Sequence, residues 1–444
     1  MPTSKPPINL FRGWPSPSLH PTSALSTAST HVLSNPSLSA PALGYGPDEG
    51  DPGLRHEIAS WLTSFYDPVA GPVSADRICI TGGASQNLAC MLQVFTDPAV
   101  TRRVWMVRPT YYLACRIFDD AGFAGRLRGV PEDDEGLDVD VLEEGLKAAE
   151  EEAMGKIETP LKTPRPWRKV YKHIIYATPT LANPSTKIMS LRRREQLVRI
   201  ARKYDALIVA DDVYDHLFWP ISPCSGVTQD KALVPRLVDI DRYLDGGPKD
   251  EFGNAMSNGS FSKIMGAGCR VGWAEGTPQF AWGVSQVGSS RSGGAPSQLV
   301  STFISHLLKT HFLQSHIANT LLPAYARRHR ILFSAAREHL LPLGVTFDDP
   351  QQNGVTGGFF LWLRLPSGLK ASELARKAKD EENLLISEGS IFGVEGDETL
   401  NTGSERDLEG YVRICFAWEE EELLEAGVKR LAAVIGRELK ALKR

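Results

Sequence analysis

The most informative stretch of the chain is Ser260-Phe-Ser-Lys-Ile-Met-Gly-Ala-Gly-Cys-Arg-Val-Gly-Trp273. In it, Lys263 stands between hydroxyl side chains and a glycine-bearing turn, and Arg270 follows seven residues later. A lysine amine held in a restricted pocket can form a Schiff base with an aldehyde. The guanidinium of Arg270 and the hydroxyls of Ser260 and Ser262 suit the oxygens of a phosphate. Taken alone, the stretch also fits a surface loop, so its interpretation depends on the motifs around it.

Strand-length apolar runs alternate with amphipathic helical stretches from about residue 76 to residue 276. This alternation predicts an α/β fold, with a mostly parallel central sheet in a large domain and helices on both faces. The runs at 77–80, 104–107, 173–177 and 206–210 are nearly continuous in apolar character, as buried parallel strands are. Past residue 294 the character changes to a long helical pattern over 297–341, two further strands and a final helix. This last third predicts a second, smaller α+β domain.

Polar side chains follow each predicted strand at the point where it ends. Asp211 and Tyr214 come after 206–210, and Asn183 comes after 173–177. Open α/β sheets bind ligands at the carboxyl ends of their strands. Asp211 could keep a heterocyclic nitrogen protonated, while Tyr214 and Asn183 could reach an oxygen on the same ring. Asp212 and Asp215 compete with Asp211 for this role, and a helix N-cap explains at least one of the three.

Two further segments continue this pattern. Residues 81–86, Thr-Gly-Gly-Ala-Ser-Gln, follow a strand and precede a helix expected at about Asn87. Backbone N–H groups at such a helix start, with glycines that allow close approach, form a phosphate site. The segment lacks the G-x-G-x-x-G spacing, so a nicotinamide-binding fold is disfavoured. The segment Pro109-Thr-Tyr-Tyr112 follows the strand at 104–107 and adds aromatic rings, one of which could stack on a flat cofactor.

Composition excludes several classes of protein. The chain has 444 residues, 42% hydrophobic and 23% charged, with a formal net charge of −4, which disfavours a general nucleic-acid binder. No apolar run approaches the ~18 residues of a membrane-spanning helix. The six cysteines lie far apart without a C-x-x-C pair, which argues against a disulfide framework or a zinc site. We therefore expect a soluble, cytoplasmic protein with no metal and no nucleic-acid or membrane partner.

In order and spacing, these motifs resemble the pyridoxal-phosphate enzymes of fold type I, and specifically the class I/II aminotransferase family. The nearest branch contains the 2-aminoadipate, kynurenine and aromatic aminotransferases. The resemblance runs from about Ile8 to the last helix. Its matching pieces are residues 8–16, 44–50 with 54–55, 81–86, 183–184, Asp211 with Tyr214, 260–270, 289–298 and 411–413.

The resemblance implies pyridoxal 5′-phosphate as the cofactor, with Lys263, Asp211 and Tyr214 as catalytic residues. Lys263 would hold the cofactor covalently and move a proton, Asp211 would pair with the ring nitrogen, and Tyr214 would contact the ring oxygen. The cofactor-binding residues would be Ser85, Gln86, Tyr111, Asn183, Asp211, Tyr214, Ser260, Ser262, Lys263, Arg270 and, from a partner subunit, Tyr45. The substrate would be bound by Asn183, Gly13 and Arg413, whose guanidinium would take the α-carboxylate.

The family organisation implies a homodimer with shared active sites. Residues 1–50 would join the small domain and the dimer interface, 51–300 would form the large cofactor-binding domain, and 301–444 the small C-terminal domain. The expected reaction moves an amino group from an L-amino acid, aromatic or 2-aminoadipate-like, to a 2-oxo acid such as 2-oxoglutarate. A lyase or synthase, performing C–S cleavage, elimination or ring formation, is the alternative on the same scaffold. A non-catalytic sensor fused to a DNA-binding module is disfavoured, because the motifs begin by Ile8.

Two departures from the family pattern leave the substrate open. Thr186 stands where the family has a glycine after Asn-Pro-Ser, and Ala267 stands where a proline is usual. Arg291 is a candidate for recognising an acidic side chain, although an exposed surface arginine explains it as well. Aromatic side chains that could line the pocket and favour aromatic or long-chain substrates are Trp14, Phe359 and Phe360, for which a core position is the alternative.

Overall fold

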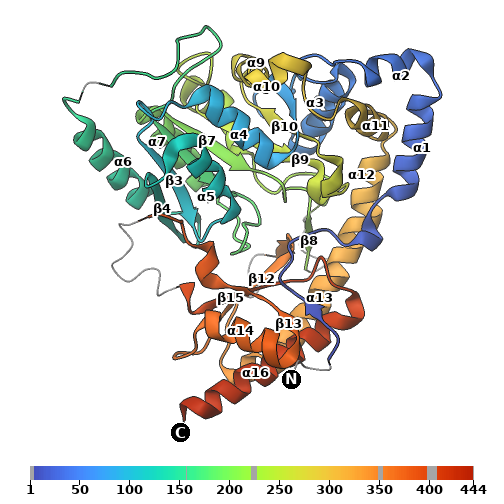
Figure 1. The fold of residues 1–444 in the computed structure, drawn as a ribbon, viewed down its shortest axis with the longest axis vertical. Coiled ribbons are helices and arrows are strands. Elements are labelled where there is room, and N and C mark those ends of the chain that lie inside the picture. The colour runs from blue at the N-terminus through green and yellow to red at the C-terminus, as the bar shows by residue number, and fades with distance from the viewer. Residues whose placement is uncertain (1–4, 157, 222–227, 349–353, 398–407, 444) are drawn as a thin grey trace.

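The computed structural model describes residues 5–156, 158–221, 228–348, 354–397 and 408–443. Cys224 lies outside these residues. The upper part of the molecule in Figure 1 is built on an eight-stranded sheet with the order β2-β10-β9-β7-β6-β3-β4-β5. Its strands are β2 (Ile78–Thr81), β3 (Arg103–Arg108), β4 (Leu127–Asp133), β5 (Gly136–Leu137), β6 (His173–Ala177), β7 (Ala206–Asp211), β9 (Ala255–Ser260) and β10 (Gly272–Glu275). The pairs β9/β7, β7/β6, β6/β3 and β3/β4 are parallel, while β10 and β5 pair antiparallel with their neighbours. The predicted, mostly parallel sheet is confirmed.

Helices cover both faces of this sheet, because successive strand residues point to opposite sides. Tyr176 and Val209 pack into one core with helices α4, α5 and α9. Ile175 and Ile208, one residue earlier in each strand, pack into the opposite core with α6, α7 and α8. The helices of this part are α3 (Pro52–Tyr66), α4 (Ala84–Phe95), α5 (Leu113–Phe118), α6 (Val139–Ala153), α7 (Leu191–Lys203), α8 (Leu237–Tyr243), α9 (Pro278–Ser285) and α10 (Gly288–Gly293).

The lower part of Figure 1 contains a three-stranded sheet with the order β12-β15-β14. Its strands are β12 (Phe360–Arg364), β14 (Ser387–Glu388) and β15 (Tyr411–Cys415). Two strand pairs connect distant segments, β1 (Ile8–Asn9) with β13 (Leu384–Leu385), and β8 (Phe218–Pro220) with β11 (Val355–Gly357). The N-terminal chain thus begins beside the lower sheet and then climbs to α1 (Thr22–Leu33) and α2 (Pro36–Leu43), in blue at the upper right of Figure 1.

The helical pattern predicted over 297–341 corresponds to several consecutive helical elements. The chain forms α11 (Gln298–Lys309), turns at His311 with a φ of 57°, and continues as α12 (Phe312–His316), a π-helical turn (Ile317–Leu321) and α13 (Leu322–His339). The spacing of apolar residues does not reveal a single residue in the left-handed conformation, so the break at His311 could not be predicted. The remaining helices are α14 (Ala371–Glu382) and α16 (Glu421–Leu442). None of the described helices is both long and apolar enough to cross a membrane.

The carboxyl ends of β2, β3, β6, β7 and β9 meet at one edge of the large sheet because these strands run in the same direction. Each strand delivers one motif to this edge, so the segments after Thr81, Arg108, Ala177, Asp211 and Ser260 come together. The sequence places the expected ligand site at the same edge.

Candidate active site

A cavity of about 540 Å³ lies at this edge, between the large sheet and the three-stranded sheet. Most of the predicted site residues line it, namely Gly13, Ser85, Tyr111, Asn183, Asp211, Tyr214, Ser260, Ser262, Lys263, Arg270 and Arg413. The side chains of Gln86 and Tyr45 lie elsewhere. The sequence motifs therefore converge on one cavity from segments that are far apart along the chain.

Lys263 is presented to the cavity by a tight turn. Strand β9 ends at Ser260, and a 3-10 turn (Phe261–Lys263) follows, whose first free N–H is capped by the Ser260 side chain. The Lys263 Nζ donates a hydrogen bond of 2.8 Å to the carbonyl oxygen of Gly13 and lies 5.5 Å from the Tyr214 ring centroid. Burial lowers the pKa of Lys263 from 10.5 to about 8. A large fraction of its amine is thus neutral, and nucleophilic, near pH 8.

Asp211 is the last residue of β7 and is almost fully buried. Its Oδ2 accepts a hydrogen bond of 2.7 Å from the hydroxyl of Tyr176, while its Oδ1 is buried without a hydrogen-bond partner. Burial raises the pKa of Asp211 to about 6, an effect that Tyr176 and Lys263 partly offset. A buried carboxylate oxygen without a partner costs free energy unless a donor reaches it. A protonated ring nitrogen has the charge and the donor that this oxygen lacks.

Arg413 enters the cavity from the middle of β15, where it pairs in register with Ser387 on one side and Trp362 on the other. Its Nη1 donates 2.8 Å to Asn183 Oδ1, and its Nη2 donates 2.7 Å to the carbonyl oxygen of Phe11. These acceptors are neutral, and no carboxylate of the described chain forms an ion pair with Arg413. The guanidinium therefore keeps its full charge for an anionic ligand, although burial lowers its pKa.

Asn183 is oriented by the same contact. Because its Oδ1 accepts from Arg413, its amide Nδ2 is left as a donor toward the cavity. This fits the predicted hydrogen bond from Asn183 to a ring oxygen.

The start of α4 forms a corner suited to a phosphate. The helix begins at Ala84, three residues earlier than predicted, so Ser85 lies in its first turn. Gly83, with a φ of 98°, brings the backbone close to Arg270, and a Cβ built on Gly83 would stand 3.4 Å from the guanidinium. The Ser260 hydroxyl donates 2.9 Å to Ser262 Oγ beside them. Free N–H groups, hydroxyls and a guanidinium are the groups that hold phosphate oxygens.

Comparison with known proteins agrees with this geometry. The family described as Aminotransferase class I and II matches residues 28–431 of the chain. The chain belongs to this aminotransferase family.

Three similar proteins extend the comparison. The Uncharacterized protein YER152C of Saccharomyces cerevisiae is 33% identical and covers 96% of this chain and 96% of its own length. The Aromatic-amino-acid aminotransferase 1 of Thermococcus litoralis is 29% identical over 98% of this chain and 89% of its own length. The structure of LysN, the alpha-aminoadipate aminotransferase of Thermus thermophilus complexed with N-(5′-phosphopyridoxyl)-L-leucine, has 26% identity and a TM-score of 0.75, covering 98% of this chain and 93% of its own.

These comparisons confirm the predicted resemblance to fold type I aminotransferases of the aromatic and 2-aminoadipate branch, and the chain is an aminotransferase. Pyridoxal phosphate is the cofactor that the family implies. The residues at the cavity fit this cofactor. The buried Asp211 Oδ1 has no hydrogen-bond donor, the Lys263 amine is bonded only to a carbonyl, and the start of α4 has groups that bind phosphate.

Two predicted residues of the aminotransferase site lie outside the cavity. The Gln86 side chain accepts from the Gly82 N–H and donates to Cys90 Sγ, so it is turned toward its own helix. Tyr45 is 93% exposed and lies beside Gly293, away from the site of its own chain. An exposed position is what a residue reaching a partner subunit requires, and both roles stay predictions.

Of the aromatic residues predicted to line the substrate pocket, two lie on the cavity wall and one lies in the hydrophobic core. Trp14 and Phe360 line the cavity, whereas Phe359 is fully buried and packs against the Tyr214 ring with centroids 5.6 Å apart. Arg291 forms an ion pair with Asp48 and is not among the residues that line the cavity.

Thr186 takes over the conformation of the glycine that it replaces. Its φ of 62° lies in the left-handed region that favours glycine. Its N–H donates to the carbonyl of Ala182, and its hydroxyl donates to the carbonyl of Ser185. The loop after Asn183 thus holds a residue with a side chain in a left-handed conformation, stabilised by these two hydrogen bonds.

Sequence reasoning missed Tyr176 and Phe11, and it assigned Gly13 to the substrate rather than to Lys263. Tyr176 orients Asp211 from the neighbouring strand, and the carbonyls of Phe11 and Gly13 bind Arg413 and Lys263. A signal for Tyr176 was available, because a tyrosine one residue before the end of a buried strand must find a hydrogen-bond partner near the sheet edge. Backbone carbonyls leave no such trace in a sequence.

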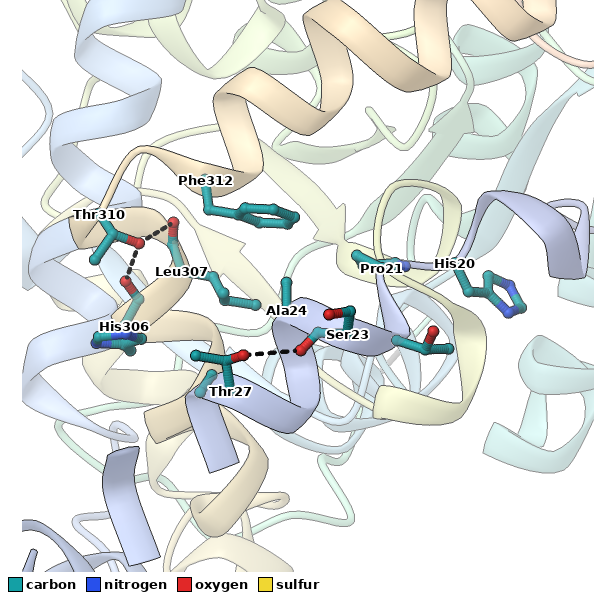
Figure 2. Close-up of a pocket in the computed structure, with 11 residues that line it drawn as sticks. His20, Pro21, Ser23, Ala24, Thr27, His306, Leu307, Thr310 and Phe312 are labelled. Carbon is teal, nitrogen blue, oxygen red and sulfur yellow. Dashed lines mark hydrogen bonds between the residues drawn. The ribbon is translucent and has the colours of Figure 1, made fainter. Parts of the chain in front are cut away.

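A second cavity, of about 450 Å³, lies between α1 and the corner of α11 and α12 (Figure 2). Residues from both sides line it, and no Lys, Arg, Asp or Glu is among them. Two of its hydroxyls are bonded within their own helices, since Thr27 donates to Ser23 O and Thr310 donates to His306 O (Figure 2). The described lining offers no group for amino-group transfer.

Proposed function

We propose that this aminotransferase holds pyridoxal phosphate on Lys263 and transfers an amino group from an aromatic or 2-aminoadipate-like L-amino acid to a 2-oxo acid such as 2-oxoglutarate. One observation carries the proposal. A single cavity brings together the amine of Lys263, the unpartnered oxygen of Asp211 and the guanidinium of Arg413.

Each residue then has a defined task in holding the cofactor. Asp211 Oδ1 accepts from the ring N–H, and Tyr176 keeps that carboxylate in place. The Asn183 amide and the Tyr214 hydroxyl contact the ring oxygen, and Tyr111 lies against the ring. The phosphate would be held by Ser85 and the backbone N–H groups of the first turn of α4, that of Gln86 included, and by Ser260, Ser262 and Arg270.

Pyridoxal phosphate, when bound, withdraws electrons from the substrate α-carbon and lowers the barrier to removing its proton. As a free amine, Lys263 Nζ would take that proton, because its lowered pKa of about 8 suits a base near pH 8. Arg413 binds the α-carboxylate by two N–H groups and fixes which bond of the α-carbon is broken. Asp211 keeps the ring nitrogen protonated throughout.

The substrate class rests on the cavity walls and on the relatives. Trp14 and Phe360 offer aromatic surface to a long or aromatic side chain. The similar proteins are named for aromatic amino acids and for aminoadipate. None of these names is that of a lyase.

The proposed assembly is a homodimer with shared active sites, to which Tyr45 contributes from the partner. The exposure of Tyr45 supports this assembly. Mixing Lys263→Ala chains with Tyr45→Ala chains should restore activity to one site of each mixed dimer. The divisions at residues 50 and 300 and the cytoplasmic location stay predictions.

A donor and acceptor assay tests the reaction. The purified protein is supplied with pyridoxal phosphate, L-phenylalanine or L-2-aminoadipate, and 2-oxoglutarate, and both oxo acids and ammonia are measured. We expect glutamate to form in a one-to-one ratio with the new oxo acid, and Lys263→Ala to abolish it while the exposed Lys156→Ala does not. Ammonia released without consumption of 2-oxoglutarate would contradict the proposal and favour the lyase.

A further inference from the structure

The cavity has one more cationic side chain than the proposed contacts to the cofactor and the α-carboxylate use. Arg12, Lys263, Arg270 and Arg413 line it, against the single carboxylate of Asp211. Within the described ranges, none of these four cations forms an ion pair with a carboxylate; their side-chain hydrogen bonds go to neutral acceptors. Cations gathered in a cleft without acidic partners attract anionic ligands.

Three of the four cations have a task in the proposed function. Lys263 binds the cofactor aldehyde, Arg270 the phosphate and Arg413 the α-carboxylate. Arg12 has no anionic group assigned to it, although it lies in the sequence between two residues that contact Arg413 and Lys263. The carbonyl of the preceding Phe11 accepts from Arg413, and the carbonyl of the following Gly13 accepts from Lys263.

The Arg12 guanidinium is held in place by two indole rings. It lies 4.9 Å from the ring centroid of Trp14 and 5.2 Å from that of Trp418, and these two rings meet edge to face. Its backbone is also fixed, because its N–H donates to Asn9 Oδ1. The two indole rings contact the cation without accepting a hydrogen bond from it, so its N–H groups stay available to a carboxylate in a two-pronged pair.

We propose that Arg12 binds a carboxylate at the far end of the substrate side chain, so that among aliphatic substrates the site favours dicarboxylates, both 2-oxo acids and amino acids, over monocarboxylates of equal length. This deepens the proposed function and rests on it. Arg291, the sequence-based candidate for the same task, is already paired with Asp48 outside the cavity.

The test compares two acceptors of equal length, 2-oxoglutarate and 2-oxopentanoate, in the wild type and in Arg12→Gln. The loss of one charge-assisted pair at an exposed position should raise the KM for 2-oxoglutarate about tenfold and leave that for 2-oxopentanoate unchanged. The control is Arg376→Gln, an exposed arginine of α14 paired with Asp380, which should alter neither value. Equal effects of Arg12→Gln on both acceptors, or a wild type that does not distinguish them, would overturn the proposal.

Two further measurements separate the possible failures. Glutarate binding to the cofactor-loaded protein, followed by calorimetry, needs no turnover and should weaken about tenfold in Arg12→Gln, whereas pentanoate binding should not change. If no amino donor supports transfer in the wild type, the proposed function is wrong. The glutarate measurement would still show whether Arg12 binds a carboxylate. If pyridoxal phosphate itself binds more weakly to Arg12→Gln, Arg12 serves the phosphate and the proposal is wrong. Arg12→Lys, which keeps the charge and loses the fork, gives an intermediate KM and covers the case in which Arg12→Gln does not fold.

Discussion

Replacement of Asp211 by asparagine should stabilise the cofactor-free protein and at the same time remove most of its activity. Asn is nearly isosteric with Asp, and its amide oxygen can still accept from the Tyr176 hydroxyl. What it lacks is the negative charge, which burial makes costly and which the ring nitrogen of the cofactor requires. The two effects therefore have opposite signs.

The gain in stability follows from the shifted pKa. Burial raises the pKa of Asp211 from 3.8 to about 6, so the folded chain binds this proton more tightly than the unfolded chain does. At a pH below 3.8 both states are protonated and the group makes no difference. As the pH rises from 3.8 to 6, the stability that this proton provides is lost. The loss is about 3 kcal/mol, at 1.36 kcal/mol for each unit of difference between the folded and unfolded pKa.

The assay is urea unfolding of the cofactor-free wild type and of Asp211→Asn at pH 4.5 and pH 7.5. We expect the variant to be more stable by about 1 kcal/mol at pH 4.5, where the unfolded wild type has already lost most of this proton, and by about 3 kcal/mol at pH 7.5. Asp134→Asn, which changes a fully exposed carboxylate, serves as control and should show no such gap. With cofactor and substrates, kcat of Asp211→Asn should fall by about a hundredfold or more. A variant equally stable at pH 7.5, or fully active, would refute this reasoning.

Three further predictions follow from the same contacts. Tyr176→Phe removes the hydroxyl that favours the charged form of Asp211, so the free energy of unfolding of the cofactor-free protein should fall by about 2 kcal/mol at pH 8 and kcat should fall about tenfold. Unchanged values in urea unfolding and steady-state kinetics would mean that this hydrogen bond contributes to neither stability nor catalysis. Asn183→Asp places a carboxylate against Arg413 and should raise the KM of the amino donor about tenfold or more, whereas a KM equal to that of the wild type would show that Arg413 does not bind the substrate. Because burial lowers the pKa of Lys263 to about 8, the rate at which pyridoxal phosphate attaches to the cofactor-free protein should rise with pH and level off above pH 8; a stopped-flow absorbance profile still rising toward pH 10.5 would contradict this.

The parts of the fold that were predictable are those in which apolar patterning controls the backbone. Strand β6 at His173–Ala177 is buried throughout and coincides with the predicted range, and β7 extends the predicted range by one residue to Asp211. Once the strands are parallel, the meeting of their carboxyl ends follows from geometry. For this reason the motifs after each strand could be assigned to one site before any contact was known.

Strand β9 shows what patterning cannot detect. Its sequence Ala255-Met-Ser-Asn-Gly-Ser260 is mostly small and polar, yet every residue is buried. The Asn258 amide oxygen accepts 2.7 Å from Asn87, and the Ser257 hydroxyl donates 2.5 Å to Asp212. Gly259 makes room for Trp273, whose ring would lie 2.0 Å from a Cβ there. These polar groups are satisfied by partners far away in the sequence, so only the assembled structure explains why this strand is central.

The site was predictable in its residue types and not in its supporting contacts. Asp211 and Arg413 stand out by charge within apolar strands, but their partners Tyr176 and Asn183 come from another part of the chain. Arg12 carries no motif and is identified only by its place on the cavity wall and its lack of a carboxylate partner among the described residues.

The covalent attachment of the cofactor to Lys263 can be measured on the intact protein. The purified protein is loaded with pyridoxal phosphate, reduced with borohydride, digested and analysed by mass spectrometry, with Lys263→Ala treated in parallel. We expect loss of the visible absorbance on reduction and a phosphopyridoxyl group on the peptide containing Lys263, absent from the variant. A label on another lysine, or a protein that stays colourless with the cofactor, would contradict the assignment of this cavity as the site of amino-group transfer.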